Sequence, residues 1–168
     1  MAHPPGPDIT AEGEFLTHLH ERGLRPSHEA LTPFAHWITP PHSPKRFDTH
    51  FFLAHAPEGQ EAIHDGREAV EALWIRPEVA VFEAQAGRRT LVFPTRLNLL
   101  RLARHSSAKD AITAAAGTPI VTVMPEPIPD GAGGTLLRIP EEAGYGGSLF
   151  PALGGPAAGG LWPGQTKV

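Results

Sequence analysis

The segment from Lys45 to Thr49 places side chains that can bind an anion at the start of an apolar run. Lys45 and Arg46 are cationic, Asp48 and Thr49 offer oxygen atoms, and Phe51, Phe52 and Leu53 follow soon after. A guanidinium group presents a planar fork of N–H donors that matches phosphate and carboxylate oxygens. These residues are therefore candidate ligand contacts. The alternative is an ion pair between Arg46 and Asp48 that holds a loop, which stabilises little at a surface.

The carboxylates of Glu68 and Glu71 form a second candidate group. Two acidic side chains near a turn could supply oxygen ligands to a shared metal or act as a general base. The alternative is a solvated strand edge, where acidic side chains are common. Glu68 and Glu71 are the candidate catalytic residues of this chain, and the sequence leaves both interpretations open.

Histidine is abundant, with ten residues, and cysteine is absent. Any metal must therefore be held by oxygen or imidazole ligands. His18 and His20 are two apart on an expected helix, so their side chains point to different sides. His36, His50 and His55 lie on expected strands without an evident third ligand. No histidine spacing is specific for zinc, so surface or packing roles are preferred and a dedicated zinc site is a third interpretation. We assign no metal ligand within the chain.

Composition limits the class of protein. The chain has 168 residues, 40% of them hydrophobic, which is enough for one buried core. Its net charge of −4 and the lack of a long Lys/Arg cluster argue against a nucleic-acid partner. No apolar run approaches the ~18 residues that span a bilayer, and the first residues do not have the pattern of a signal peptide. We expect a cytoplasmic protein without a membrane partner.

Two segments rich in aromatic and branched residues, 31–39 and 46–56, are typical of antiparallel strands joined by a proline-containing loop. This pairing would place Lys45, Arg46 and Asp48 at the rim of a sheet.

The remaining pattern alternates helices with short strands. Helices are predicted at 12–22, ended by Gly23, at 77–86, from a Thr95 cap to about 102, and at 107–117 with Ser107 and Asp110 as a capping box. Extended segments are predicted at 68–75 and 90–93, and a hairpin at 120–124 and 136–139.

We expect a flexible lead-in at 1–8, one domain over 9–150, and a flexible Gly/Pro-rich tail at 151–168.

Five blocks in this order resemble the second half of Nudix hydrolases, in the branch of acyl-coenzyme A diphosphatases. The blocks are HWITP, PKRFDTHFFLA, HDGREAVEALWIRPEVAV, FPTRLNLLRLA and RIPEEAGYGG. The resemblance extends from about Glu14 to about Gly147, and PKRFDTHFFLA is the part most specific to the branch. It implies an α+β fold: a partial Nudix-like mixed sheet with flanking helices and a C-terminal β-hairpin.

The family's catalytic motif, the Nudix box, is a set of glutamates that binds Mg²⁺ at a diphosphate. Two segments imitate it incompletely. In the first, Arg67 and Glu68 match, but Ala72 and Trp74 replace a glutamate and a glycine. In the second, Glu141–Tyr145 matches the end of the box, but Pro140 would disrupt the helix. We therefore expect a C-terminal portion that does not contain the Mg²⁺ ligands.

The resemblance implies a Mg²⁺-dependent pyrophosphohydrolase acting on acyl-coenzyme A or related nucleoside diphosphate compounds, inactive by itself. The alternative is a non-catalytic Nudix-like module that binds a ligand or a protein. In either case Lys45, Arg46, Asp48 and Thr49 would contact a coenzyme A-like or nucleotide diphosphate ligand. A homodimer, or a partner chain that carries the box, would cover the missing part of the sheet.

Overall fold

A computed structural model describes residues 12–25, 27–59, 64, 66 and 71–152. It divides the chain into two compact units, one formed by Met1–Leu31 and Ala54–Trp74, the other by Thr32–Leu53 and Ile75–Val168. The predicted lead-in at 1–8 lies outside the described residues, as does nearly all of the predicted tail.

The first unit contains helix α1 (Glu12–Glu21) and the 3-10 helix η1 (His28–Ala30). The predicted helix and its end are confirmed. Gly23 has a φ of +64°, and the amide of Leu24 donates to the carbonyl of Leu19 over 2.8 Å. A left-handed residue after the last turn followed by such a bond is the usual glycine ending of a helix.

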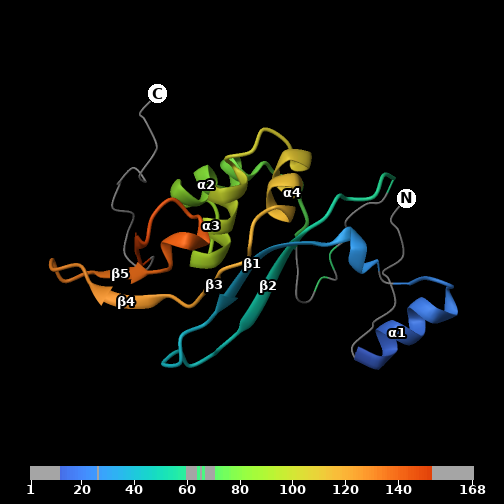
Figure 1. The fold of residues 1–168 in the computed structure, drawn as a ribbon, viewed down its shortest axis with the longest axis horizontal. Helices are drawn as coiled ribbons and strands as arrows, with labels where there is room; N and C mark the ends of the chain where they lie inside the picture. The colour runs from blue at the N-terminus through green and yellow to red at the C-terminus, as the bar shows by residue number, and fades with distance from the viewer. Residues whose placement is uncertain (1–11, 26, 60–63, 65, 67–70, 153–168) are drawn as a thin grey trace. The chain divides into compact units, whose positions relative to one another are not determined.

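The second unit is built on a mixed sheet with strand order β2–β1–β3 (Figure 1). Strands β1 (Thr32–Ile38) and β2 (Asp48–Leu53) pair antiparallel, which confirms the predicted pair. The short strand β3 (Thr122–Val123) pairs parallel with β1. A bulge at Phe34, the residue of β1 that has no partner on β2, turns both Phe34 and Ala35 inward, and both side chains are buried.

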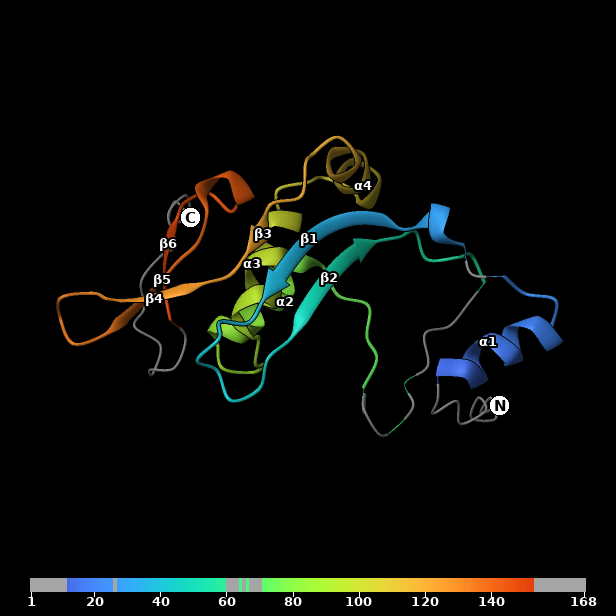
Figure 2. The same cartoon turned by 60° about the horizontal axis from the view of Figure 1, so that its bottom comes forward.

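Three helices lie on one side of this sheet: α2 (Pro77–Gln85), α3 (Phe93–Leu102) and α4 (Ala108–Ala116) (Figure 2). The predicted start of α4 is confirmed, because the Ser107 hydroxyl accepts from the Asp110 amide over 3.1 Å. Among the described residues, no helix has the length and apolar character needed to cross a bilayer.

The predicted strand at 90–93 and the Thr95 cap are wrong. Helix α3 begins at Phe93, with Val92 as its N-cap and no side-chain cap. Pro94 explains the earlier start, since its fixed φ suits the first helical turn and Thr95 is already inside the helix. The predicted extended segment at 68–75 is described only from Glu71, and residues 71–76 form no regular secondary structure.

A second sheet has the order β4–β5–β6 (Figure 2). Its strands are β4 (Glu126–Pro129), β5 (Thr135–Arg138) and β6 (Leu149–Pro151), all antiparallel to their neighbours, with the 3-10 helix η2 (Glu141–Ala143) before β6. A C-terminal hairpin is present, but its first strand is 126–129 and not the predicted 120–124. Thr122–Val123 pairs with β1 instead. The fold is α+β, as predicted.

The core of the second unit lies between the first sheet, the helices and the chain around η2. It contains Phe34, Ala35, Trp37, Leu97, Ala115, Val123, Ile139, Ala143, Tyr145 and Phe150. Leu97 on α3 and Val123 on β3 are almost completely buried, at 1% exposure each. The first sheet therefore has one face packed against the core, and the side chains on its other face are not part of that core.

Candidate functional site

The segment that contains the sequence-predicted ligand contacts alternates between two environments. Lys45, Phe47, Thr49 and Phe51 line a cavity. Asp48 lies between them and contacts imidazole groups instead. Successive side chains of an extended segment point to opposite faces. The candidate ligand contacts are therefore divided between two sites within the second unit.

The cavity has a volume of about 610 Å³, within the usual range for small-molecule sites. Most of its lining is apolar. It is formed by Trp37, Ile38, Thr39, Pro40, His42, Ser43, Lys45, Phe47, Thr49, Phe51, Val92, Phe93, Pro94, Thr95, Pro125, Pro127 and Leu137. A surface of this kind can bury a hydrocarbon chain or an aromatic ring, with a few polar groups to orient it.

Two features of the cavity favour a negative charge. The Lys45 ammonium lies 4.9 Å from the centroid of the Phe47 ring, so Phe47 supports the cation beside the cavity. The N-cap residue Val92 and the first residues of helix α3, Phe93 to Thr95, also line the cavity, and no side chain caps this end. The amide groups of a helix N-terminus carry partial positive charge and can donate to an anion.

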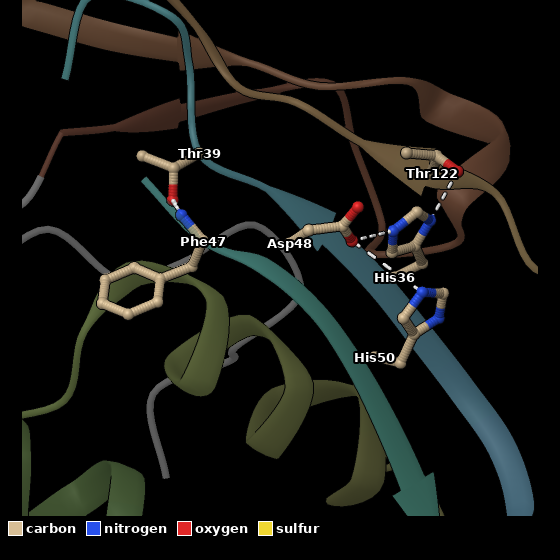
Figure 3. Close-up of polar contacts among 6 residues, drawn as sticks. All are labelled: His36, Thr39, Phe47, Asp48, His50 and Thr122. Carbon is tan, nitrogen blue, oxygen red and sulfur yellow. Dashed lines mark hydrogen bonds and ion pairs between the residues drawn. The ribbon is translucent and has the colours of Figure 1, made fainter. Parts of the chain in front are cut away.

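The loop that supports Lys45 is closed at its base by Thr39 and Phe47. The Thr39 amide donates to the Phe47 carbonyl over 2.9 Å. Figure 3 shows the second bond, which the Phe47 amide donates to the Thr39 hydroxyl over 3.1 Å. Arg46 donates from Nε to the Thr39 carbonyl over 3.4 Å, a long and weak bond. In this structure Arg46 contacts the loop backbone, whereas Lys45 and Thr49 line the cavity.

Asp48 belongs to a cluster with His36 and His50. Its Oδ1 atom lies 2.6 Å from Nε2 of His36 and 3.8 Å from Nε2 of His50 (Figure 3). The two imidazole rings are stacked, with centroids 4.0 Å apart and planes at 6°. The Nδ1 atom of His36 lies 2.8 Å from the Thr122 hydroxyl of strand β3.

The cluster was not predicted from the sequence, because no third ligand was evident near His36 or His50 and Asp48 was assigned to ligand contact. The signal that was available is the spacing of Asp48 and His50, two apart on one strand and therefore on one face. The missing information is the register, which pairs His36 with His50 across the sheet.

The predicted catalytic carboxylates are not part of either site as described. Glu68 lies outside the described residues, and Glu71 belongs to the first unit, outside regular secondary structure. The second imitation of the Nudix box contains η2, a single short 3-10 turn that ends at Ala143 and is followed by Gly144.

A buried hydrogen-bonded chain supports the cavity wall. Trp37 donates from Nε1 to the Tyr145 hydroxyl over 3.0 Å, and that hydroxyl donates to Oδ1 of Asn98 over 2.7 Å. Burial raises the pKa of Tyr145, while its bond from Trp37 and the nearby Arg101 guanidinium act in the opposite direction. These two hydrogen bonds hold the side chain of Trp37, which is one of the residues that line the cavity.

The His36–Asp48–His50 group does not fit the Mg²⁺ that the resemblance implies. Mg²⁺ prefers oxygen ligands and keeps several waters, whereas this group offers two imidazole nitrogens and one carboxylate. Among the described residues it is the group in which three possible ligand side chains of this kind converge. We therefore derive no catalytic step through Mg²⁺.

Comparisons with protein-family models, curated proteins and solved structures found no match.

Proposed function

We propose that the second unit binds a ligand that joins an apolar portion to an anionic group, and that acyl-coenzyme A is the class that fits best. One observation carries the proposal: a largely apolar cavity of about 610 Å³ with the Lys45 ammonium and the N-terminus of α3 in its wall. The apolar lining suits an acyl chain, and the positive groups suit a phosphate.

The resemblance of PKRFDTHFFLA to acyl-coenzyme A diphosphatases supports the same ligand class. Lys45 and Thr49 are the residues of this block that line the cavity, and we assign them to ligand contact. Arg46 would hold the Lys45 loop through the Thr39 carbonyl. The chain would then bind its ligand without cleaving it.

Hydrolysis is the alternative function. It requires carboxylates, which none of the residues described as lining the cavity supplies, so they would come from Glu68 and Glu71 or from a partner chain that carries a Nudix box. Mg²⁺-dependent cleavage of the diphosphate by the purified chain, followed by mass spectrometry of the two products, would establish this alternative. Loss of that cleavage in Glu71→Gln would then assign a role to Glu71.

Calorimetric titration of the full chain tests the binding proposal. Octanoyl-coenzyme A should bind more tightly than butanoyl-coenzyme A, from which it differs by four CH₂ groups. Each buried CH₂ contributes about 0.8 kcal/mol, so burial of all four corresponds to about 3 kcal/mol, or roughly 200-fold in Kd. Coenzyme A without an acyl chain should bind most weakly. Equal affinity for all three would contradict an acyl site.

The charge contribution is tested with a matched pair of lysine variants. Lys45→Ala should weaken octanoyl-coenzyme A binding about tenfold, because a hydrogen bond to a charged group is worth about 1.5–3 kcal/mol and the site is partly open. Lys109→Ala removes an exposed lysine of α4 that does not line the cavity, and should leave Kd unchanged. Equal effects of the two substitutions would show that Lys45 acts only through net charge.

A further inference from the structure

We propose that His36, Asp48 and His50 form a binding site for Zn²⁺ on the sheet face opposite the Trp37–Thr49 pair. The register of the antiparallel strands brings the three side chains together. His36 pairs with His50 across the sheet, and Asp48 precedes His50 by two residues and so shares its face. Neighbouring residues of the same strands, Trp37 and Thr49, line the cavity, so the two proposals are structurally independent.

The distances are close to those that a metal needs. One possible ligand atom from each side chain lies within 4.8 Å of the other two. Zn²⁺ takes nitrogen and oxygen ligands at about 2.0–2.2 Å, so the ligand atoms of a tetrahedral site are about 3.4 Å apart. Oδ1 of Asp48 lies 2.6 Å from Nε2 of His36, closer than this spacing, and 3.8 Å from Nε2 of His50, slightly farther. The side chains of Asp48 and His50 are 65% and 59% exposed, so their rotation can widen the first distance and shorten the second.

The His36 side chain is already held in position. It is only 15% exposed, and its Nδ1 atom lies 2.8 Å from the Thr122 hydroxyl. When Nε2 binds a metal, Nδ1 carries the proton and can donate it to that hydroxyl, which accepts as well as it donates. Such a bond from the second ring nitrogen orients metal-ligating histidines in general.

The ligand types select the metal. Two imidazoles and one carboxylate suit Zn²⁺ and its first-row neighbours, whereas Mg²⁺ and Ca²⁺ require oxygen ligands. Three protein ligands leave a fourth tetrahedral position for water or for a ligand group. The exposure of Asp48 and His50 gives the ion a route from solvent.

Titration of Co²⁺ into tag-free full-length chain tests the site, because tetrahedral Co²⁺ replaces Zn²⁺ and absorbs in the visible range. We expect one equivalent to bind with this absorption, Zn²⁺ to displace it, and millimolar Mg²⁺ to leave it unchanged. No saturable binding, or displacement by Mg²⁺, would overturn the proposal.

Variants locate the ion. Both His50→Ala and Asp48→Asn change exposed side chains, and each should weaken Co²⁺ and Zn²⁺ binding at least tenfold. Thr122→Ala, which leaves all three ligands, should weaken it by roughly 10–100-fold through His36. His105→Ala, a histidine outside the cluster, is the control and should bind one equivalent with unchanged affinity. If circular dichroism shows folded variants and His50→Ala binds as tightly as His105→Ala, the ion is elsewhere.

Discussion

Tyr145→Phe gives the sharpest test of how the core supports the cavity. The Tyr145 side chain is 6% exposed, and its hydroxyl accepts from Trp37 and donates to Asn98. The substitution keeps the ring and removes only the oxygen atom. Both partners are buried, Trp37 at 3% exposure and Asn98 at 5%, so no water replaces the lost bonds readily.

The expected cost follows from the two groups that lose their partner. A buried donor or acceptor left without a hydrogen bond costs about 1–3 kcal/mol. The indole N–H of Trp37 and the side-chain amide oxygen of Asn98 both lose this partner. Burial of the phenyl ring is slightly more favourable than burial of the phenol, which offsets a small part of the cost. We therefore expect Tyr145→Phe to lower the free energy of unfolding by about 2–4 kcal/mol.

Urea denaturation followed by circular dichroism measures this change, and the midpoint should fall by roughly 1–2 M with the slope unchanged. Combining Tyr145→Phe with Asn98→Leu removes both partners of one bond. The double variant should be more stable than the sum of the single effects predicts, by about 1 kcal/mol. A loss below about 0.5 kcal/mol for Tyr145→Phe would refute the assignment of this hydroxyl as a structural link.

Two further predictions concern the same region. Tyr145 is the chain's one tyrosine, so tyrosinate absorbance follows it alone. Because burial raises its pKa in the folded state, it should ionise at higher pH in the native chain than in denaturant, where its pKa is about 10. The stability that the folded state gains from keeping this hydroxyl protonated is fully present below the unfolded-state pKa and is lost as pH rises through the folded-state pKa. Equal titration midpoints of Tyr145 in the folded and denatured states would contradict burial. Gly144→Ala should lower the free energy of unfolding by about 1–2 kcal/mol, because Gly144 has a φ of +75°. Gly117→Ala, at a φ of −92°, should not destabilise the chain, and similar urea midpoints for the two variants would argue against backbone strain at Gly144.

Local chemistry in the sequence was enough to locate several elements. Pro77 in a first turn, the Ser107–Asp110 cap and the glycine ending at Gly23 each depend on neighbours within a few residues, and all three are found. The start of α3 was missed although Pro94 carried the same signal as Pro77. There, the β-branched and aromatic residues before Pro94 favoured a strand, but 90–92 has no strand structure.

Pairing over long distances could not be predicted in the same way. Strand β3 reaches β1 across the sequence, and the contact between His36 and Thr122 joins residues 86 positions apart. Nothing near residue 122 indicates that partner, and the apolar run at 120–124 was assigned to the nearest later strand instead. The cavity could not be predicted for the same reason, because its wall brings together residues that are far apart in the sequence. The β1–β2 loop meets the start of α3 and Pro125, Pro127 and Leu137 there.

The segment from Lys45 to Phe51 shows why a short motif need not be one site. Its residue types suggested a single set of ligand contacts, yet an extended segment presents alternate residues to opposite faces. Lys45, Phe47, Thr49 and Phe51 face the cavity, and Asp48 and His50 meet His36 on the other face. A substitution at Thr49 should therefore act on ligand binding and one at Asp48 on metal binding, although the two residues are adjacent. The alternation of side chains between the two faces, more than the composition of the motif, decides which of the two sites each residue can contribute to.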